Sequence, residues 1–218
     1  TIAYKGRLAI NLKVSVEDSA HASAPWLSKN AIEETMIFAK ELKEGLESDQ
    51  EKKSKGMLLT VTLTEIDGGT SHNVTPKECV STFDIRIPVD TNCKIVEQKI
   101  SGLVNEIAQR RKVEAYYSII DETEPFEAPH DSAIVRAFTL GIMDIEHTRP
   151  TLIRKTGTGD MNVIGNQWKI PVVTYGPGDP HQAHTIDERV SIDEYLRGIE
   201  ILKRMIHHLK RLHDKSIQ

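Results

Sequence analysis

Residues 8–16 read LAINLKVSV, and this stretch decides how the first half of the chain folds. Apolar side chains occupy every even position from Leu8 to Val16, and small or polar ones occupy the odd positions between them. A period of two is typical of a β-strand with one buried face and one wet face. The stretch therefore predicts a strand at the surface of a sheet that is covered on one side.

A helix is predicted directly after the loop that leaves this strand. Asn30 and Glu33 have the spacing of a capping box, in which a side chain satisfies the free amides of the first turn. Apolar residues then recur at helical spacing. They are Ile32, Met36, Ala39, Leu42 and Leu46.

Three more alternating stretches predict strands, at residues 57–66, 80–88 and 112–120. A second helix, capped by Thr91 or Asn92, falls between the last two of them. The order β-α-β-β-α-β predicts an α+β domain, with an antiparallel sheet and two helices on one face.

The pattern changes near residue 121, where we expect a domain boundary. The following part alternates helices with short apolar strands near 150–154 and at 171–175, which is typical of an α/β domain. Its last helix begins at Ser191, which forms a capping box with Glu194. Two strands are too few for a parallel sheet that is buried on both faces, so part of this sheet is expected to be missing from the chain.

Composition excludes several classes of function. The 218 residues carry a net charge of −4, so no strong positive field favours nucleic acid, and small molecules or proteins are the expected partners. No apolar run reaches the roughly 18 residues that a membrane span needs. Two cysteines without close spacing favour a reducing compartment, and we therefore expect a cytoplasmic protein.

Four polar side chains are candidate site residues. His184, in a loop after the strand at 171–175, could ligate a metal, although a solvated loop histidine is the simpler alternative. His21 lies among small residues in a loop that could equally be an ordinary turn. Arg86 points away from the helices and could bind a carboxylate, or it could form a surface ion pair near Asp84; Asn73 precedes it in a turn-rich connector.

Four ordered motifs resemble one family. They are GRLAINLKVSVEDSAHAS with NAIEE, GGTSHNVTPKECVSTFDIRIP, KTGTGDMN, and PVVTYGPGDPHQAHTIDERVSIDEY. Together they resemble the co-catalytic zinc aminoacylase and carboxypeptidase family of clan MH metallopeptidases, and most closely its carrier-protein lysine/ornithine hydrolase branch. The resemblance implies an α/β catalytic domain that is interrupted by an α+β lid, which pairs two subunits. Residues 6–121 would be the lid, and residues 1–5 and 122–218 the C-terminal portion of the catalytic domain.

The resemblance also implies roles for the four residues. His184 matches a metal ligand, and His21 matches the lid histidine that polarises the scissile carbonyl in the partner subunit. Asn73 and Arg86 match lid residues that bind the substrate's carboxylate and nearby polar atoms. The family's enzymes use two zinc or cobalt ions to activate water against an amide.

Most of that active site does not occur in this sequence. The family's His-x-Asp pair, bridging Asp and catalytic Glu-Glu pair precede the lid, and the only Glu-Glu here, Glu33-Glu34, falls in the lid helix. A zinc hydrolase needs roughly three protein ligands per metal and a base. We therefore expect a C-terminal portion that binds zinc weakly and is inactive alone.

The expected activity of the whole enzyme is release of lysine or ornithine from a carrier-protein or N-acyl conjugate. An acetylornithine deacetylase or a dipeptidase on the same scaffold is one alternative. A non-catalytic dimerisation or carrier-binding module is the other.

Overall fold

The computed structural model describes residues 1–48, 57–179, 182 and 185–216, and within it the chain forms two compact units. Unit 2 consists of Lys5–Pro125 with Thr156–Thr158, and unit 1 of Thr1–Tyr4, Phe126–Lys155 and Gly159–Gln218. Among the described residues no helix is long and apolar enough to cross a membrane.

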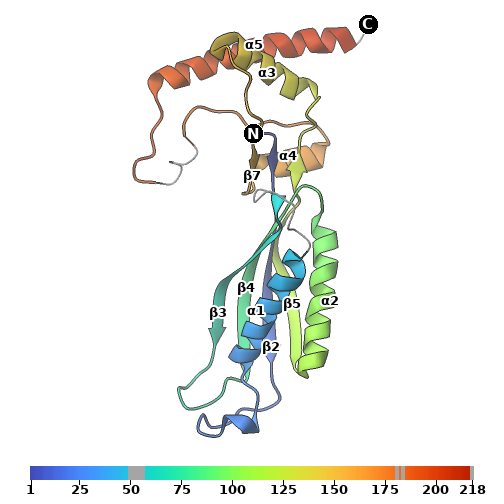
Figure 1. Cartoon of the computed structure of the whole chain (residues 1–218), viewed down its shortest axis with the longest axis vertical. Coiled ribbons are helices and arrows are strands. Elements are labelled where there is room, and N and C mark those ends of the chain that lie inside the picture. Colours follow the sequence, from blue (N-terminus) through green and yellow to red (C-terminus); the bar gives the residue numbers. More distant parts are fainter. Residues whose placement is uncertain (49–56, 180–181, 183–184, 217–218) are drawn as a thin grey trace. The chain divides into compact units, whose positions relative to one another are not determined.

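Unit 2 is a four-stranded antiparallel sheet with two helices. The strands lie in the order β3-β4-β2-β5, so the first long strand, β2, is central. Figure 1 shows the helices α1 and α2 running along the sheet. The elements are β2 (Gly6–Ser15), η1 (Pro25–Leu27), α1 (Ala31–Glu47), β3 (Thr60–Gly68), β4 (Glu78–Ile87), α2 (Cys93–Arg111) and β5 (Glu114–Thr123). This confirms the predicted α+β topology.

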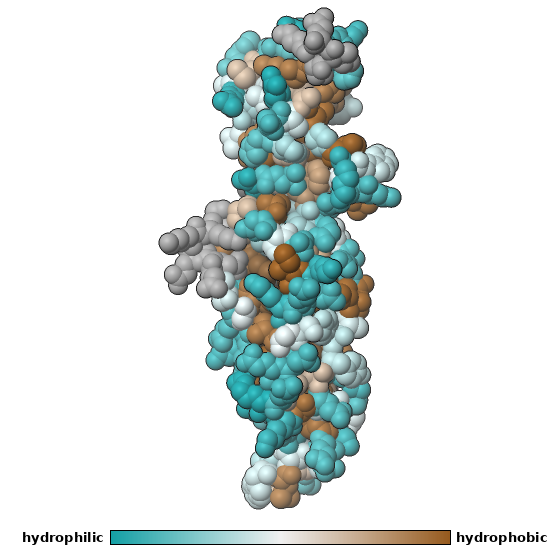
Figure 2. Space-filling model, turned by 90° about the vertical axis from the view of Figure 1, so that its right-hand side faces the viewer, coloured by the Kyte–Doolittle hydropathy of each residue, from teal (hydrophilic) through white to brown (hydrophobic). Residues whose placement is uncertain are grey.

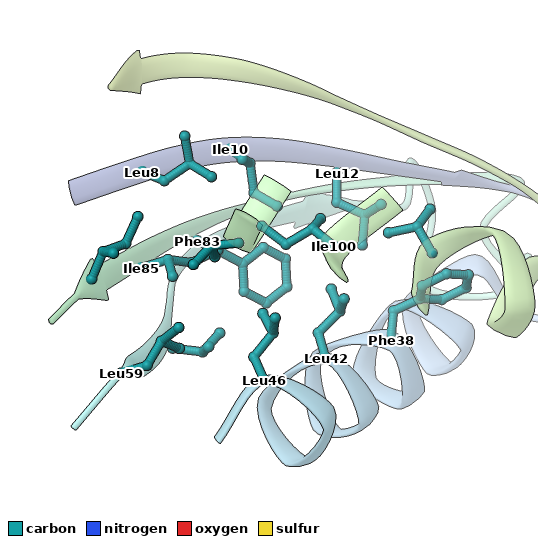
Figure 3. Close-up of a cluster of buried hydrophobic side chains, with 14 of the residues drawn as sticks. Leu8, Ile10, Leu12, Phe38, Leu42, Leu46, Leu59, Phe83, Ile85 and Ile100 are labelled. Carbon is teal, nitrogen blue, oxygen red and sulfur yellow. The ribbon is translucent and has the colours of Figure 1, made fainter. Parts of the chain in front are cut away.

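The core of unit 2 lies between the sheet and both helices. Even-numbered residues of β2 face inward, as the alternation predicted, and they meet Phe83 and Ile85 of β4. Figure 3 shows these side chains facing Phe38, Leu42 and Leu46 of α1 and Ile100 of α2. Because both helices contact the same core, they cover the same face of the sheet.

The predicted inner face of α1 was partly wrong. Met36 is 52% exposed, whereas Thr35 and Phe38 are buried together with Leu42 and Leu46. The buried positions follow the steps of three and four residues that keep side chains on one side of a helix, and Met36 lies outside that stripe. Periodicity alone cannot choose between two neighbouring apolar stripes.

Unit 1 contains a small mixed sheet and three helices. Its strands lie in the order β6-β1-β7, antiparallel on one side of β1 and parallel on the other. The elements are β1 (Ala3–Tyr4), β6 (Phe126–Glu127), α3 (Ala133–Glu146), β7 (Arg154–Lys155), α4 (Asp160–Trp168) and α5 (Ile192–Ser216).

The strand predictions for unit 1 were largely wrong. Residues 171–175 form no strand, and the stretch predicted near 150–154 contributes only Arg154 to the two-residue β7. The backbone of Thr174 does pair with Thr1, with Thr174 N donating to Thr1 O at 3.1 Å and the terminal amine of Thr1 donating back at 2.8 Å. A strand needs hydrogen-bonding neighbours along its length, and here the described chain supplies them at one residue only.

Helix α5 packs on α3 through one face and exposes another apolar face. Ile201 and Met205 are buried against α3, where Gly141 allows the backbones to approach closely. The apolar stripe that predicted this helix is exposed instead, and hydrophobic surface is visible over α3 and α5 in Figure 2. The exposed residues are Ile192 (76%), Tyr195 (53%), Ile199 (36%), Leu202 (40%) and Ile206 (63%).

Candidate functional site

His21 and Asn73 are brought together by two loops at one end of the unit 2 sheet. These loops, residues 16–30 and 68–77, are called the tip loops below. His21 forms an isolated antiparallel bridge with Val74, and the backbone N–H of Ala22 donates to the carbonyl of Asn73 at 2.9 Å. Two residues that the sequence separates by 52 positions are therefore neighbours in the fold.

The His21 side chain is exposed and is oriented from one ring nitrogen. Its Nδ1 lies 2.8 Å from Ser23 Oγ and accepts from the Ser23 backbone N–H at 3.1 Å. An acceptor at Nδ1 places the ring proton on Nε2 in the neutral tautomer. The described part of the chain gives Nε2 no partner, so this N–H can donate to a ligand.

The Asn73 side chain is also held from one side. Ser71 Oγ donates to Asn73 Oδ1 at 2.6 Å, and both residues are exposed. An amide carries two N–H donors on its nitrogen as well as the acceptor oxygen. With the oxygen engaged by Ser71, the Nδ2 group is left to donate on the same tip as His21.

Arg86 lies at the opposite end of the sheet. It pairs in register with Arg7 near the beginning of β2, whereas the tip loops join at Ser15 and Glu78. The ten residues of β4 separate the two ends, which corresponds to about 30 Å at the usual rise of a strand. Arg86 and Asn73 of one chain therefore cannot contact the same small substrate.

The Arg86 guanidinium forms a bidentate ion pair with Asp84. Its Nε donates to one carboxylate oxygen at 2.6 Å and its Nη2 to the other at 2.9 Å. The guanidinium still has donors on its remaining edge, because it carries five in total. The ion pair expected as the simple alternative is present, and it also orients the group.

A second cation lies beside Arg86 and carries a perturbed pKa. Lys5 is buried, and its Nζ donates to the carbonyl of Leu58 at 2.5 Å. Burial lowers the pKa of Lys5, and the nearby positive charge of Arg86 lowers it further. Lys5 and Arg86 are thus neighbouring basic groups at this end of the unit 2 sheet, where the Asp84 carboxylate pairs with Arg86.

The predicted metal ligand His184 lies outside the described residues, as does its neighbour His181. The described ends of their loop are anchored in unit 1: Gly178 N donates to Glu194 Oε1 at 3.0 Å, and Glu194 N to Ser191 Oγ at 3.5 Å. The Ser191 half of the predicted capping box is confirmed. The Glu194 carboxylate does not complete the box, because it accepts from Gly178 N in the loop.

The same loop borders a cavity of unit 1. Its volume is about 730 Å³, and its lining is largely apolar, with Ile2, Phe138, Ile142, Val173 and Tyr175 among the contributors. The Tyr175 ring packs 5.4 Å from that of Phe138, and burial together with Glu146 and Glu194 raises the pKa of Tyr175. Such a lining suits apolar side chains better than a charged substrate.

The loop that reads TGTGDMN forms a helix cap. Asn162 is buried, its Oδ1 accepts from Gly159 N at 2.9 Å, and its N–H donates to the Gly159 carbonyl at 3.0 Å. The bonds close the first turn of α4, so capping accounts for this motif.

The described residues do not provide the ligand set of a zinc hydrolase. Among them only Cys93, Glu122 and Glu124 bring three possible ligand atoms together. Burial and the two carboxylates raise the pKa of the Cys93 thiol to about 12, and Glu124 accepts from Cys93 N at 3.1 Å. Because Glu124 accepts from the amide of the first residue of α2, this cluster caps that helix.

Glu34, half of the only Glu-Glu pair, has a structural role. It is 4% exposed and accepts two hydrogen bonds of 2.7 Å from Arg111, which link α1 to the end of α2.

One feature of the tip loops was missed from the sequence. Trp26 and Leu27, in the same loop as His21, are 78% and 72% exposed. The sequence could have indicated them, because they are a large apolar pair in a mostly polar loop.

The Peptidase dimerisation domain family of M20 proteins matches residues 2–112. A LysW-lysine/LysW-ornithine hydrolase of Saccharolobus islandicus is 32% identical over 146 residues, which are 67% of this chain and 39% of that protein. A Pyrobaculum aerophilum protein, provisionally named for the same activity, is 30% identical over 95% of this chain and 55% of its own length.

Solved structures show the same fold. A tripeptidase from Staphylococcus aureus has a TM-score of 0.77 at 19% identity, covering 97% of this chain and 53% of its own. An M20 family metallo-carboxypeptidase from Sulfolobus solfataricus has a TM-score of 0.73 at 15% identity, covering 95% and 59%. The chain thus spans between about two fifths and three fifths of the length of these proteins.

Proposed function

Because the chain belongs to the M20 peptidase family of metallohydrolases, we propose that it is the C-terminal portion of an amidohydrolase that releases lysine or ornithine from carrier-protein or N-acyl conjugates. Residues 6–121 would be the lid and dimerisation domain, and residues 1–5 and 122–218 part of the catalytic domain. The substrate class rests on the names of relatives that are 30–32% identical.

The observation that carries the assignment to a larger catalytic domain is the exposed stripe of α5. Its large side chains, from Ile192 to Ile206, recur at helical spacing on a face that α3 does not cover. Contiguous exposed apolar surface of this kind marks a site of contact. The remaining 41–47% of the matched M20 structures has no counterpart in this chain and is the natural cover for this face.

The proposed site combines two subunits. His21 and Asn73 lie at one end of the sheet and Arg86 at the other, and the edge strands β3 and β5 are each available for a further strand in the described chain. When an edge strand pairs with its own copy about a two-fold axis, the strands run antiparallel. The tip of one sheet then lies toward the Arg86 end of the other.

Each residue would have a distinct role in that composite site. The Nε2 proton of His21 would donate to the scissile carbonyl oxygen as negative charge develops on it, and Asn73 would orient the amide from the same tip. Arg86 of the second subunit, held by Asp84, would bind the substrate's carboxylate through its free edge. His184 would serve as a metal ligand.

Zinc or cobalt would supply the activated water in the whole enzyme. The described residues do not hold a ligand set for either ion.

Enzyme assays test the substrate class. A protein that joins the proposed catalytic half to residues 1–218 is supplied with zinc and assayed on carrier-linked lysine, carrier-linked ornithine, acetylornithine and dipeptides. We expect the highest kcat/KM on the carrier conjugates and no turnover by residues 1–218 alone. Turnover by the 218-residue chain would contradict the proposed division of the active site.

A peptidase is the second candidate, favoured by the fold likeness to a tripeptidase. A dipeptide or tripeptide that gives the highest kcat/KM in the same assay would establish it instead.

A mixing experiment tests the composite site. Whole-protein variants His21→Ala and Arg86→Ala are each expected to lose most activity. When they are mixed and exchange subunits, half the dimers are mixed and each mixed dimer has one intact site, so about a quarter of wild-type activity should return. If both residues act within one chain, every site carries a defect and no activity returns.

A further inference from the structure

The lid tip displays two large apolar side chains that the interior of unit 2 does not use. Trp26 is 78% exposed and Leu27 72%, and they are consecutive residues of the short helix η1. In Figure 2 the end of unit 2 is mostly white and teal, with one small brown group. Polar residues dominate the rest of these loops, so the pair is an exception that needs an explanation.

The loop that carries the pair is a built structure. Ala24 N donates to the His21 carbonyl at 2.8 Å, Leu27 N to the Ala24 carbonyl at 3.2 Å, and the Ser28 hydroxyl to the Asp18 carbonyl. Pro25 occupies the first turn of η1, where its fixed φ suits the helix. These bonds fix the backbone of the loop, which leaves both side chains exposed.

A second anchor ties this loop to the one that carries Asn73. Ala20 N donates to Thr75 Oγ1 at 2.7 Å, and Thr75 N donates to the Ala20 carbonyl at 2.8 Å. The two loops consequently form one connected surface, which carries His21, Asn73, Trp26 and Leu27. A contact made by any of them positions the others.

We infer that Trp26 and Leu27 are the apolar anchor by which the tip of one chain seats on a second copy of this chain beside the composite site. The inference rests on the proposed function, because it uses the role of His21 across the dimer. Residues 2–112 match a dimerisation domain, and this segment includes the whole tip. A Trp side chain has only two rotatable torsions to fix on binding and is typical of the energetic centre of an interface.

A positioning role follows from the shared loop. His21 and Trp26 are only five positions apart, so an indole that is fixed against the second copy determines how closely the His21 ring approaches the carbonyl there. The anchor thus couples dimer formation to completion of the site.

Fluorescence quenching tests the anchor in the 218-residue chain. Trp168, the other tryptophan, is 65% exposed and lies at the end of α4, so Trp168→Phe leaves Trp26 as the sole reporter. Sedimentation equilibrium gives the dimer dissociation constant, and acrylamide quenching is measured well below and well above it. We expect the Stern–Volmer constant of Trp26 to fall at least twofold in the dimer.

Two variants complete the test. Trp26→Ala with Leu27→Ala should weaken dimerisation at least tenfold. Trp168→Ala, which removes a tryptophan that is 65% exposed and lies outside the tip, should leave dimerisation unchanged. Circular dichroism checks that both variants remain folded, which is expected because the substituted side chains are exposed.

Three outcomes would overturn the inference. If Trp26 quenching is the same in monomer and dimer, and the double variant dimerises with unchanged affinity, Trp26 and Leu27 are not the anchor. The proposed activity is unaffected by that result. A chain that stays monomeric removes the dimer as well. Protection of Trp26 only after a carrier-linked lysine substrate is added would assign the pair to carrier binding instead.

Discussion

Two asparagines begin the helices of the lid. Asn30 Oδ1 accepts from Ile32 N at 3.0 Å and Glu33 N at 3.4 Å, and Asn92 Oδ1 accepts from Ile95 N at 2.9 Å. Both were predicted from the sequence, Asn92 as one of two candidates. A cap depends only on residues within one helical turn, which is why the signal is readable from a short stretch.

Replacing Asn30 with alanine should destabilise unit 2 by about 1 kcal/mol, because two amides at the start of α1 lose their acceptor. Urea unfolding followed by circular dichroism measures the change. Asn105→Ala, at an exposed position inside α2, is the control and should not lower the stability. Equal effects of the two substitutions would show that the cap contributes nothing.

At the scale of elements, two glycines in helices should respond oppositely to alanine. A Cβ on Gly141 would lie 2.9 Å from Met205 N and 3.0 Å from Ile201 O of α5, so Gly141→Ala should force α3 and α5 apart and cost about 1–3 kcal/mol. A Cβ on Gly102 meets nothing within 4 Å, so Gly102→Ala should stabilise α2 by about 0.5–1 kcal/mol. Thermal unfolding distinguishes them, and a stabilising Gly141→Ala would contradict the close crossing.

The contact between α3 and α5 should also depend on pH. His208 Nε2 lies 2.8 Å from Asp144 Oδ2, and this hydrogen bond is the main cause that lowers the pKa of Asp144 below its ordinary 3.8. Because the pKa of Asp144 is lower in the folded state than in the unfolded state, the ionised carboxylate stabilises the fold above pH 3.8. This stabilisation is lost as the pH falls through the folded-state pKa.

Asp144→Asn should therefore be less stable than the parent at pH 6, and the difference should shrink as the pH falls below 3.8. Unfolding by urea at each pH measures the difference, and Asp131→Asn, at an exposed loop position, is a suitable control. A difference between Asp144→Asn and the parent that persists undiminished at pH 2 would exclude the ionised carboxylate as its source.

At the scale of the whole molecule, the two units differ in how completely they bury their apolar surface. The 17 residues of the main core cluster all lie between Leu8 and Ile107, inside unit 2. Unit 1 instead exposes the α5 stripe and borders a largely apolar cavity of about 730 Å³. We therefore expect unit 2 to fold by itself and unit 1 to need a further surface that covers the α5 stripe.

Residues 5–125 expressed alone should therefore fold and unfold cooperatively, whereas residues 126–218 alone should not. Circular dichroism and urea unfolding measure both, and binding of a hydrophobic dye by 126–218 is the expected sign of its exposed surface. Aggregation of 5–125 under conditions where the full chain is soluble would show that its core depends on unit 1.

The features that the sequence by itself determined are those governed by near neighbours. The alternation from Leu8 to Val14, the caps at Asn30 and Ser191 and the order of elements in unit 2 are all present, because strand pleat, helix pitch and capping act over a few residues. The family likeness adds specificity because it compares several ordered motifs at once.

Tertiary structure decided what depends on distant partners. It chose Phe38 over Met36 for the core, since the packing of α1 on the sheet selects one of two adjacent stripes. It left 171–175 without a strand, because a strand exists only where neighbours pair with it. It also joined His21 to Asn73 and separated both from Arg86 by the length of β4, because antiparallel pairing places residues by register and not by their spacing in the sequence.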